Sequence, residues 1–374
     1  MTDPLRISAT YRLRVGAGER SHRAQTLALE QSIEMLASSV TDQHVLDKIV
    51  ARVDDVTTEI DGTHTARLAL SIETIGDDAG QLMNMLFGNS SLQPDVELID
   101  VEMPSVVAQI WGGPNHGIAG MRRHTGALAR PLTCTALKPI GSTLEALAEM
   151  CSVFAASGID VIKDDHGWAN QSAAPFAQRV RACQRAIARA NGARGRGQAL
   201  YAPSLYGHYG EMRLQLDLAR REGVRVVLIA PMLCGVATLV ALKQEFDDMM
   251  FIAHPSLAGL PIAPAALLGK LFRLFGADAV IFPNHGGRFS FSRDACRAIA
   301  RCNTQPWHDL KPALPTPAGG MSVERSAEMV AEYGHDSMLL IGGALLAPRE
   351  QLAARSAEFV NAVAVAAGDA VLVH

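Results

Sequence analysis

The stretch PLTCTALKPIGSTLEALAEMCSVFAASGIDVIKDDHG, residues 131–167, contains a complete strand–helix–strand unit. Its first apolar run, residues 131–137, predicts a buried strand, and residues 142–157 carry apolar side chains at helical spacing. A second apolar run, residues 159–162, is interrupted only by Asp160 and then ends in four ionisable side chains and a glycine. Ionisable groups at the end of a buried strand are costly to desolvate, so their concentration here indicates a binding site.

The same alternation of short apolar strands and amphipathic segments continues to residue 342. Eight such units in roughly 245 residues fit the length of a (β/α)8 TIM barrel. A doubly wound open sheet is the competing fold, but no glycine-rich phosphate loop opens the first helix. We therefore predict a barrel domain over residues 126–374. Its expected strands cover residues 131–137, 160–163, 199–204, 224–231, 249–254, 278–283, 313–318 and 337–342.

Residues 6–104 have a different pattern. Alternating apolar and polar residues predict strands, and two segments with helical spacing separate them, in the order strand, helix, strand, strand, helix, strand. This order predicts an α+β ferredoxin-like domain with a mainly antiparallel sheet. We place this domain at residues 1–125.

The overall composition restricts the class of protein. Hydrophobic residues make up 48% of the 374 residues and charged residues 19%, which allows a large core and argues against extensive disorder. The net charge of −4 predicts no strongly basic surface for nucleic acid. The six cysteines form no CxxC pair and are typical of reduced thiols, and neither a signal-peptide core nor an 18-residue apolar run is present. We expect a cytoplasmic protein whose partners include neither nucleic acid nor a membrane.

Polar residues gather at the carboxyl ends of the predicted barrel strands, where the active sites of such barrels lie. A single histidine in such a place is more often a structural group, but random surface polarity would not select the same end of every strand. The candidates are Lys138, Lys163, Asp164, Asp165, His166, Ser204, His254, Asn284, His285, Arg288, Gly319, Gly320, Gly342 and Gly343.

These residue types indicate three kinds of chemistry. Paired glycines after the seventh and eighth strands let backbone N–H groups face an anion such as phosphate, although glycines also serve simply to turn the chain. Burial and mutual repulsion lower the pKa of two neighbouring lysines, so Lys138 or Lys163 could be a neutral base or nucleophile. Asp164 and Asp165 oppose that effect, and a magnesium ion held by the carboxylates would restore the balance.

Several motifs resemble those of one family. GIDVIKDDHG (residues 158–167) resembles the GG-D-x-x-KDDE motif of the large subunit of ribulose-bisphosphate carboxylase (Rubisco). CTALKP (134–139) resembles its G-T-I-K-P-K strand and WGGPNHGI (111–118) its F-x-GP-x-HGI linker, while AGGM and IGG stand where the family has two phosphate-binding glycine runs. The order and spacing hold from about Arg6 to Gly343. The resemblance therefore covers nearly the whole chain and implies a small α+β domain before a barrel.

The resemblance also implies roles for individual residues. Lys163 occupies the position that carbon dioxide carbamylates, Asp165 that of a magnesium ligand, and Lys138 that of the enolising base. His254 keeps the strand-five histidine. His166 stands where the family has a glutamate ligand, and a neutral imidazole puts magnesium affinity and metal identity in question.

The N-terminal domain contributes two further residues by resemblance. Glu30 and Asn89 match a glutamate and an asparagine with which the family completes the neighbouring subunit's site. Asn89 also follows a glycine in a turn dipeptide, which is its simpler interpretation. The carried-over roles imply an active unit that is at least a homodimer.

The departures from the family pattern argue against carboxylation. Ile140 and Pro255 replace a lysine and an arginine, and Phe282 stands in place of the strand-six histidine. Because the arginine and that histidine bind the family's second phosphate, we expect a substrate with one phosphate, bound by Gly319, Gly320, Gly342 and Gly343. The loop NHGGRFSFS is short and lacks the lysine that orients carbon dioxide. The chain therefore resembles the type IV, Rubisco-like branch.

These expectations define the predicted function and its rivals. We predict metal-assisted enolate chemistry on a keto-sugar or keto-sugar-acid monophosphate, with His254, His285 or Arg288 recognising the polar end of the substrate. Decarboxylation, carboxyl transfer, enolisation and isomerisation all pass through such an intermediate. The lost glutamate of the KDDE run favours sugar acids over the thioribulose-phosphate enolase or isomerase chemistry of methionine salvage, which stays an alternative. A non-catalytic sugar-phosphate-binding protein is the rival from another class.

Overall fold

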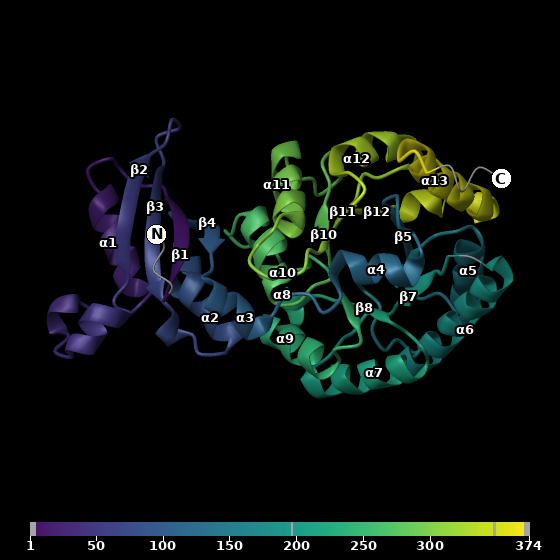
Figure 1. Ribbon diagram of the computed structural model, residues 1–374, viewed down its shortest axis with the longest axis horizontal. Coiled ribbons are helices and arrows are strands. Elements are labelled where there is room, and N and C mark those ends of the chain that lie inside the picture. Colours follow the sequence, from purple (N-terminus) through teal and green to yellow (C-terminus); the bar gives the residue numbers. More distant parts are fainter. Residues whose placement is uncertain (1–4, 196, 347–348, 370–374) are drawn as a thin grey trace.

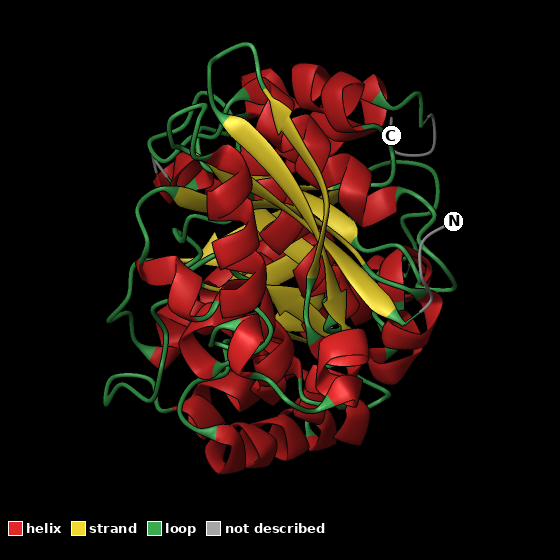
Figure 2. Cartoon of the chain, turned by 90° about the vertical axis from the view of Figure 1, so that its left-hand side faces the viewer, coloured by secondary structure: helices red, strands yellow, loops and turns green. Residues whose placement is uncertain are grey.

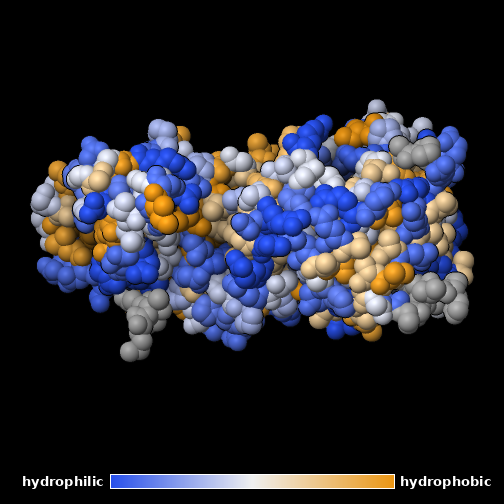
Figure 3. Space-filling model, turned by 90° about the horizontal axis from the view of Figure 1, so that it is seen from above, coloured by the Kyte–Doolittle hydropathy of each residue, from blue (hydrophilic) through white to orange (hydrophobic). Residues whose placement is uncertain are grey.

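The computed structural model describes residues 5–195, 197–346 and 349–369. Residues 1–4, which belong to the N-terminal stretch considered above, lie outside this description. Figure 1 shows two units side by side, a small sheet with helices at the left and a barrel at the right. Hydrophobic side chains are visible on the surface of both units, between hydrophilic ones (Figure 3).

The N-terminal unit has the predicted ferredoxin-like order. Its antiparallel sheet has the strand order β2-β3-β1-β4, and α1 (Arg20–Glu30) and α2 (Ala79–Phe87) connect the strands in the predicted sequence. Alternate residues of β1 are fully buried and pack with α1 and α2, which explains the period-two pattern of the sequence. In Figure 2 this unit faces the viewer, and its long strands cross the view. The strands are β1 (Arg6–Leu13), β2 (Arg52–Thr58), β3 (His64–Ser71) and β4 (Val96–Glu102).

All eight predicted strands of the barrel are present and parallel, which confirms the fold class. The sheet runs in the order β7-β6-β5-β12-β11-β10-β9-β8, and a bridge between Ser204 and Leu228 joins its two ends. The strands are β5 (Leu132–Leu137), β6 (Val161–Asp164), β7 (Leu200–Ala202), β8 (Val226–Ile229), β9 (Met250–Ala253), β10 (Ala279–Pro283), β11 (Leu314–Ala318) and β12 (Met338–Leu340).

Helices surround the barrel and bury the outward-facing residues of its strands (Figure 1). The carboxyl-terminal helix lies beside the first barrel helix and completes the ring. The helical elements are α5 (Leu144–Ala156), α6 (Phe176–Arg194), α7 (Tyr209–Arg221), α8 (Pro231–Cys234), α9 (Val236–Glu245), η5 (Ala265–Leu271), α10 (Phe272–Leu274), α11 (Arg293–Thr304), α12 (Ser326–Tyr333) and α13 (Leu352–Ala366).

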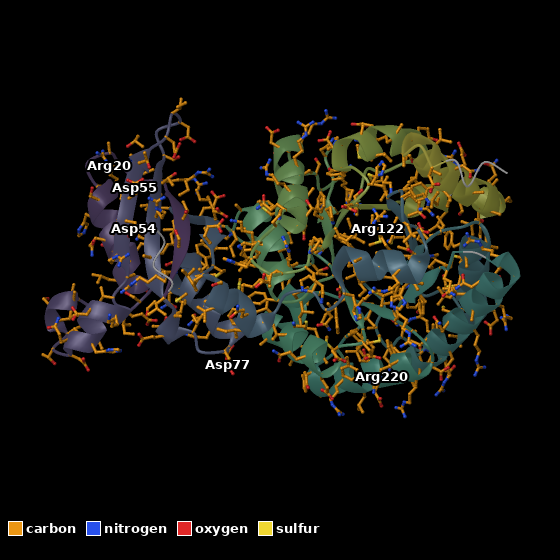
Figure 4. The ribbon with its side chains drawn as sticks, in the orientation of Figure 1. Arg20, Asp54, Asp55, Asp77, Arg122 and Arg220 are labelled. Atoms are coloured by element: carbon orange, nitrogen blue, oxygen red, sulfur yellow. The ribbon has the colours of Figure 1, made fainter. Side chains whose placement is uncertain are left out.

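A short helix closes one end of the barrel. The inward side chains of the strands form a separate core cluster, and Ile118 and Met121 of α4 (Gly117–Thr125) belong to it. Arg122, labelled on α4 in Figure 4, donates hydrogen bonds to the carbonyls of Ala127 (2.8 Å) and Arg130 (2.9 Å). Because α4 precedes β5, it covers the end at which the strands begin. It lies before the boundary predicted at residue 126, so we propose that the barrel unit begins near residue 117.

Backbone hydrogen bonds and ion pairs attach the N-terminal unit to the side of its own barrel. The Leu98 N–H donates to the carbonyl of Pro261 (3.0 Å), and the Ala263 N–H donates to the carbonyl of Leu98 (2.8 Å). Buried Lys270 of η5 pairs with Asp100 at 2.7 Å and also with Glu102. The linker includes α3 (Ser105–Trp111). Among the residues described, none of the helices is both long enough and apolar enough to cross a membrane.

Candidate active site

Strand alternation determines which side chains reach the open end of the barrel. Leu132 and Cys134 of β5, and Val161 of β6, belong to the inward core cluster. Counting on by twos places Lys138 and Lys163 on the same inward side at the carboxyl ends of these strands. On β9, Met250 and Ile252 point inward, so His254 continues that series. We call the space above these residues the barrel mouth.

Lys163 is a buried amine at the base of the mouth. Only 3% of its surface is exposed, and its Nζ donates to the backbone carbonyl of Asp164 at 3.0 Å. Burial lowers the pKa of Lys163 because desolvation disfavours the charged ammonium group. Cys134 and Asp165 act in the opposite direction, but their effect is smaller. The neutral amine is therefore more accessible than in a free lysine, and this is the form that reacts with carbon dioxide.

The two adjacent aspartates have opposite roles. Asp164 points away from the mouth and is fully buried, where it accepts hydrogen bonds from Arg179 Nε (3.0 Å), Tyr201 Oη (2.8 Å) and the Ser204 N–H (3.0 Å). These bonds satisfy the carboxylate inside the protein. Of the two aspartates, only Asp165 faces the mouth.

Asp165 holds two candidate site residues together. Lys138 Nζ donates to its Oδ2, and His166 Nδ1 lies 3.3 Å from its Oδ1. Burial alone would raise the pKa of Asp165, but the hydrogen bonds from His166 and Lys138 and the charge of Lys163 lower it well below its usual range. Asp165 is therefore a carboxylate at neutral pH.

His166 and His254 form a stacked pair over the mouth. Their ring centroids lie 4.4 Å apart with an interplanar angle of 13°. Burial, together with the charge of Lys163, lowers the pKa of His254 to about 2, so its ring is neutral. The backbone N–H of Ser256 donates to His254 Nδ1 at 3.2 Å, which leaves the proton of the neutral ring on Nε2. Ser256, whose hydroxyl lies 2.8 Å from Nδ1, was not predicted from the sequence, because it needs the bend after β9 to reach the ring.

The glycine runs form an open, backbone-lined rim next to Lys138. A Cβ added at Gly342 would lie 3.7 Å from Lys138 Cε, and one added at Gly319 or Gly343 would meet no atom within 4 Å. Gly319 and Gly320 have φ angles of 80° and 64°, which glycine adopts without strain. Unhindered backbone beside an ammonium group has the features of an anion site.

Gly320 also packs against the loop after β10. A Cβ added at Gly320 would lie 2.6 Å from the Cα of Gly287. Arg325 joins the two loops, because its Nη1 donates to the carbonyls of Gly320 (2.8 Å) and His285 (3.3 Å). The sequence analysis missed Arg325, and its only signal is a position five residues after the glycine run.

The positions of His285 and Arg288 suit the predicted role in substrate binding less well than those of Lys138 and His254. His285 Nε2 is buried with no hydrogen-bond partner among the described residues, while its Nδ1 lies 3.4 Å from Arg325. The Arg288 guanidinium lies over the exposed ring of Phe289, 4.5 Å from its centroid. Its proposed role as a carboxylate partner of the substrate therefore lacks support from this arrangement.

Two expectations for the sixth strand are wrong. Ile281 belongs to the inward cluster, so Phe282 points outward, where its ring packs against Tyr333 with a 5.9 Å centroid distance. Phe282 therefore cannot replace a histidine that faces the mouth. Asn284 is buried, with its Oδ1 accepting from Tyr333 Oη at 2.5 Å, and is a structural residue.

Glu30 and Asn89 lie together on the N-terminal unit. Asn89 Nδ2 donates to Glu30 Oε1 at 3.1 Å, and both residues border a cavity of about 50 Å³. No residue of the N-terminal unit lines the cavity that adjoins His166 and His254. In one chain, therefore, the pair forms a polar patch that does not border that cavity.

A divalent cation at the barrel mouth would need ligands from several different groups. No three His, Cys, Asp or Glu side chains in the described part of the chain are close enough to hold a metal ion. Asp165 supplies a carboxylate and His166 an imidazole, and a carbamate on Lys163 would add the oxygen ligands that magnesium prefers. A carbamate on Lys163, together with Asp165, would supply the oxygen ligands of a magnesium site, with His166 as the softer ligand.

Comparison with known proteins agrees with this fold and motif set. The family described as ribulose bisphosphate carboxylase large chain, catalytic domain, matches residues 117–282. A 5-methylthioribulose-1-phosphate isomerase of Rhodospirillum rubrum is 50% identical over 369 residues, 98% of each chain. The ribulose bisphosphate carboxylase-like protein 1 of Rhodopseudomonas palustris is 49% identical over 360 residues, 96% of this chain and 98% of the relative.

A solved structure extends the likeness to three dimensions. The crystal structure of a Rubisco-like protein from Rhodopseudomonas palustris superposes with a TM-score of 0.90 at 45% identity. The match covers 97% of this chain and 98% of that one, so it includes both units and the barrel mouth. The chain belongs to the ribulose bisphosphate carboxylase large-chain family, among its Rubisco-like proteins.

Proposed function

We propose that the protein is an isomerase of 5-methylthioribulose 1-phosphate or a closely similar keto-sugar monophosphate, acting through an enediolate. The convergence of Lys138, Asp165 and His254 beside the buried Lys163 carries this proposal, because these groups face one space at the barrel mouth. The name of the 50% identical relative supports the substrate class. It favours the methionine-salvage alternative over sugar-acid chemistry, for which Arg288 was the main argument.

In the proposed reaction, different site residues bind the substrate and move the proton. The open glycine backbone next to Lys138 binds the phosphate and fixes the sugar, so that the carbon beside its carbonyl faces the lysines. A base removes a proton from that carbon, and the electron pair moves onto the carbonyl oxygen to give the enediolate. Return of the proton to a neighbouring carbon completes the isomerisation. Lys138, or a carbamate formed on Lys163, would move this proton.

His254 and Asp165 stabilise the charge that develops. Neutral His254 presents Nε2–H as a fixed donor for a developing oxyanion, at no cost of reorganisation. Asp165 keeps Lys138 at the edge of the mouth. Carbamylated Lys163, Asp165 and His166 would hold Mg²⁺, which would polarise the substrate carbonyl when bound. The loop after β10 carries no lysine, which argues against addition of carbon dioxide to the enediolate.

We also propose that the active unit is a homodimer. The Glu30–Asn89 patch does not line the cavity beside His166 and His254, and it has the polar groups to complete a site on a second copy. The free cysteines of the described chain support a location in the reducing cytoplasm.

One experiment tests the isomerase proposal directly. The protein is incubated in D₂O with Mg²⁺, bicarbonate and 5-methylthioribulose 1-phosphate, and the products are followed by proton and phosphorus NMR. We expect deuterium on the carbon next to the carbonyl and the appearance of an isomeric sugar phosphate. Lys163→Met should abolish both signals. Tight binding without any exchange would instead support the non-catalytic alternative and contradict our proposal.

A further inference from the structure

The cavity that adjoins the stacked histidines lies on the side of the barrel away from the glycine runs. It has a volume of about 180 Å³ and lies among the segments that follow β6, β7 and β8. His166 and His254 form its wall toward the barrel mouth, so a ligand in the mouth can extend into it. We call this space the tail cavity.

The tail cavity has an apolar and sulfur-rich lining. Trp168, Leu205 and Met212 line it and are at most 5% exposed, and Tyr206 and Cys234 complete the lining on the strand-seven and strand-eight sides. Burial raises the pKa of the Cys234 thiol to about 12, so that side chain is uncharged. Trp168 Nε1 already donates to the Leu137 carbonyl at 3.1 Å. Apart from the histidines, no ionisable nitrogen of the lining is available for an anion.

The tail cavity and the glycine rim lie on opposite sides of the barrel. Around the closed ring, β7 lies four strands from β11 and β8 lies four strands from β12, the two strands that precede the glycine runs. Lys138, Lys163 and His254 come from β5, β6 and β9, between these two regions. A ligand that spans the mouth would therefore have an anionic end, a reacting middle and an apolar end.

We propose that the tail cavity binds the thioether end of the substrate, which makes the enzyme specific for 5-alkylthio keto-sugar monophosphates. This inference rests on the proposed function and adds the residues that select the substrate. A three-atom thioether tail needs roughly 60–90 Å³ at about 30 Å³ per water-sized group, so it fits the cavity. Divalent sulfur packs favourably against aromatic rings and thioethers, which Trp168, Tyr206 and Met212 provide. A hydroxyl tail would not make these sulfur contacts, and a second phosphate would find no ammonium or guanidinium group among the lining residues.

The test measures how each variant discriminates between two substrates. The values of kcat/KM are determined for 5-methylthioribulose 1-phosphate and for ribulose 1-phosphate, which carries a hydroxyl in place of the methylthio group. Their ratio does not depend on the fraction of folded enzyme. We expect the wild type to prefer the methylthio substrate by about 10- to 200-fold, the usual value of one or two apolar groups in a pocket.

Three variants locate the preference. Met212→Ser makes the cavity polar, and Ala230→Leu fills it from a position that is not fully buried, so that a folding defect in the first leaves the second available. Each should lower the ratio at least about tenfold. The matched control is Leu214→Ser, on the same helix as Met212 but 64% exposed and outside the lining, and it should keep the wild-type ratio.

The outcomes separate this inference from the proposed function. Turnover of both substrates without preference, or an unchanged ratio in both cavity variants, leaves the isomerase activity intact and refutes the tail cavity. A wild type that turns over neither substrate refutes the proposed function, and the tail-cavity inference is refuted with it.

Discussion

Two carboxylates that are adjacent in sequence have different roles, one structural and one at the candidate active site. Asp164 and Asp165 differ in sequence by a single position, but strand alternation turns them to opposite sides of β6. Asp164 pairs with Arg179, whose side chain is also fully buried, whereas Asp165 contacts Lys138 at the mouth. Substitution of the two should therefore separate stability from activity.

Asp164→Asn should destabilise the fold, and Asp165→Asn should remove activity. The first change leaves the buried Arg179 without its counter-charge, which costs about 3–5 kcal/mol of unfolding free energy. The second removes the charge that orients Lys138 and should lower kcat/KM by about 10²–10³-fold with a smaller loss of stability. Urea unfolding and steady-state kinetics on both variants measure these effects. Equal stability of the two variants would contradict the assignment.

The depressed pKa of Asp165 also predicts a dependence of stability on pH. Although burial opposes it, hydrogen bonds from His166 and Lys138 keep the folded-state pKa below the unfolded value, near 3.9. The folded state therefore binds fewer protons, so the ionised group stabilises the fold above about pH 4 and loses this contribution as the pH falls through the folded pKa. The difference between the unfolding free energies of the wild type and Asp165→Asn should shrink steadily as the pH falls from about 4 to 2. A constant difference over that range would refute this prediction.

At the scale of elements, the sequence predicts the positions of the strands better than it predicts the contacts that their side chains make. All eight barrel strands and the six N-terminal elements follow from apolar runs and alternation. Asp160, which interrupts one such run, is explained by partners about 30 residues away: Arg130 donates to both its oxygens at 2.6 and 2.9 Å, and Thr133 donates to its Oδ2. The error at Phe282 is a shift of one residue, which moves a side chain to the other face of a strand.

For the site, the sequence identifies what lies at the strand ends but not what bonds to it. Lys138, Lys163, Asp165 and His254 follow from position and family resemblance. The roles of Ser256 and Arg325 depend on loop conformations that no periodicity encodes. The tail cavity arises from three separate loops, so no local pattern predicts it.

The contact between two glycine loops yields a prediction at this scale. Gly320→Ala should destabilise the protein, because its φ of 64° is unfavourable for alanine and the added Cβ would lie 2.6 Å from Gly287 Cα. We expect a loss of about 1–3 kcal/mol, visible as a lower Tm. Gly343→Ala is the matched control, since nothing lies within 4 Å of its Cβ and its φ is not positive, and it should unfold like the wild type.

At the scale of the whole molecule, the two units stand side by side (Figure 1), and no residue of the N-terminal unit lines the cavity beside His166 and His254. This arrangement suits a dimer in which each chain supplies Glu30 and Asn89 to the other.

Mixed dimers test the shared site. Asn89→Ala and Lys163→Met chains should each be inactive alone, and mixing them after dissociation should restore about a quarter of the wild-type activity, because half of the dimers then hold one intact site. Activity is measured against the fraction of mixed dimers. If native mass spectrometry detects mixed dimers but no activity returns, the two residues do not complete one site across the two chains.

The helix that covers the amino-terminal end of the barrel has a kinetic consequence. Because α4 closes that end, substrate enters and product leaves by the same opening. The isomeric product of the proposed reaction would keep the phosphate and the tail of the substrate and would therefore compete with it for the same place. Net turnover would then depend on a following reaction that consumes the product.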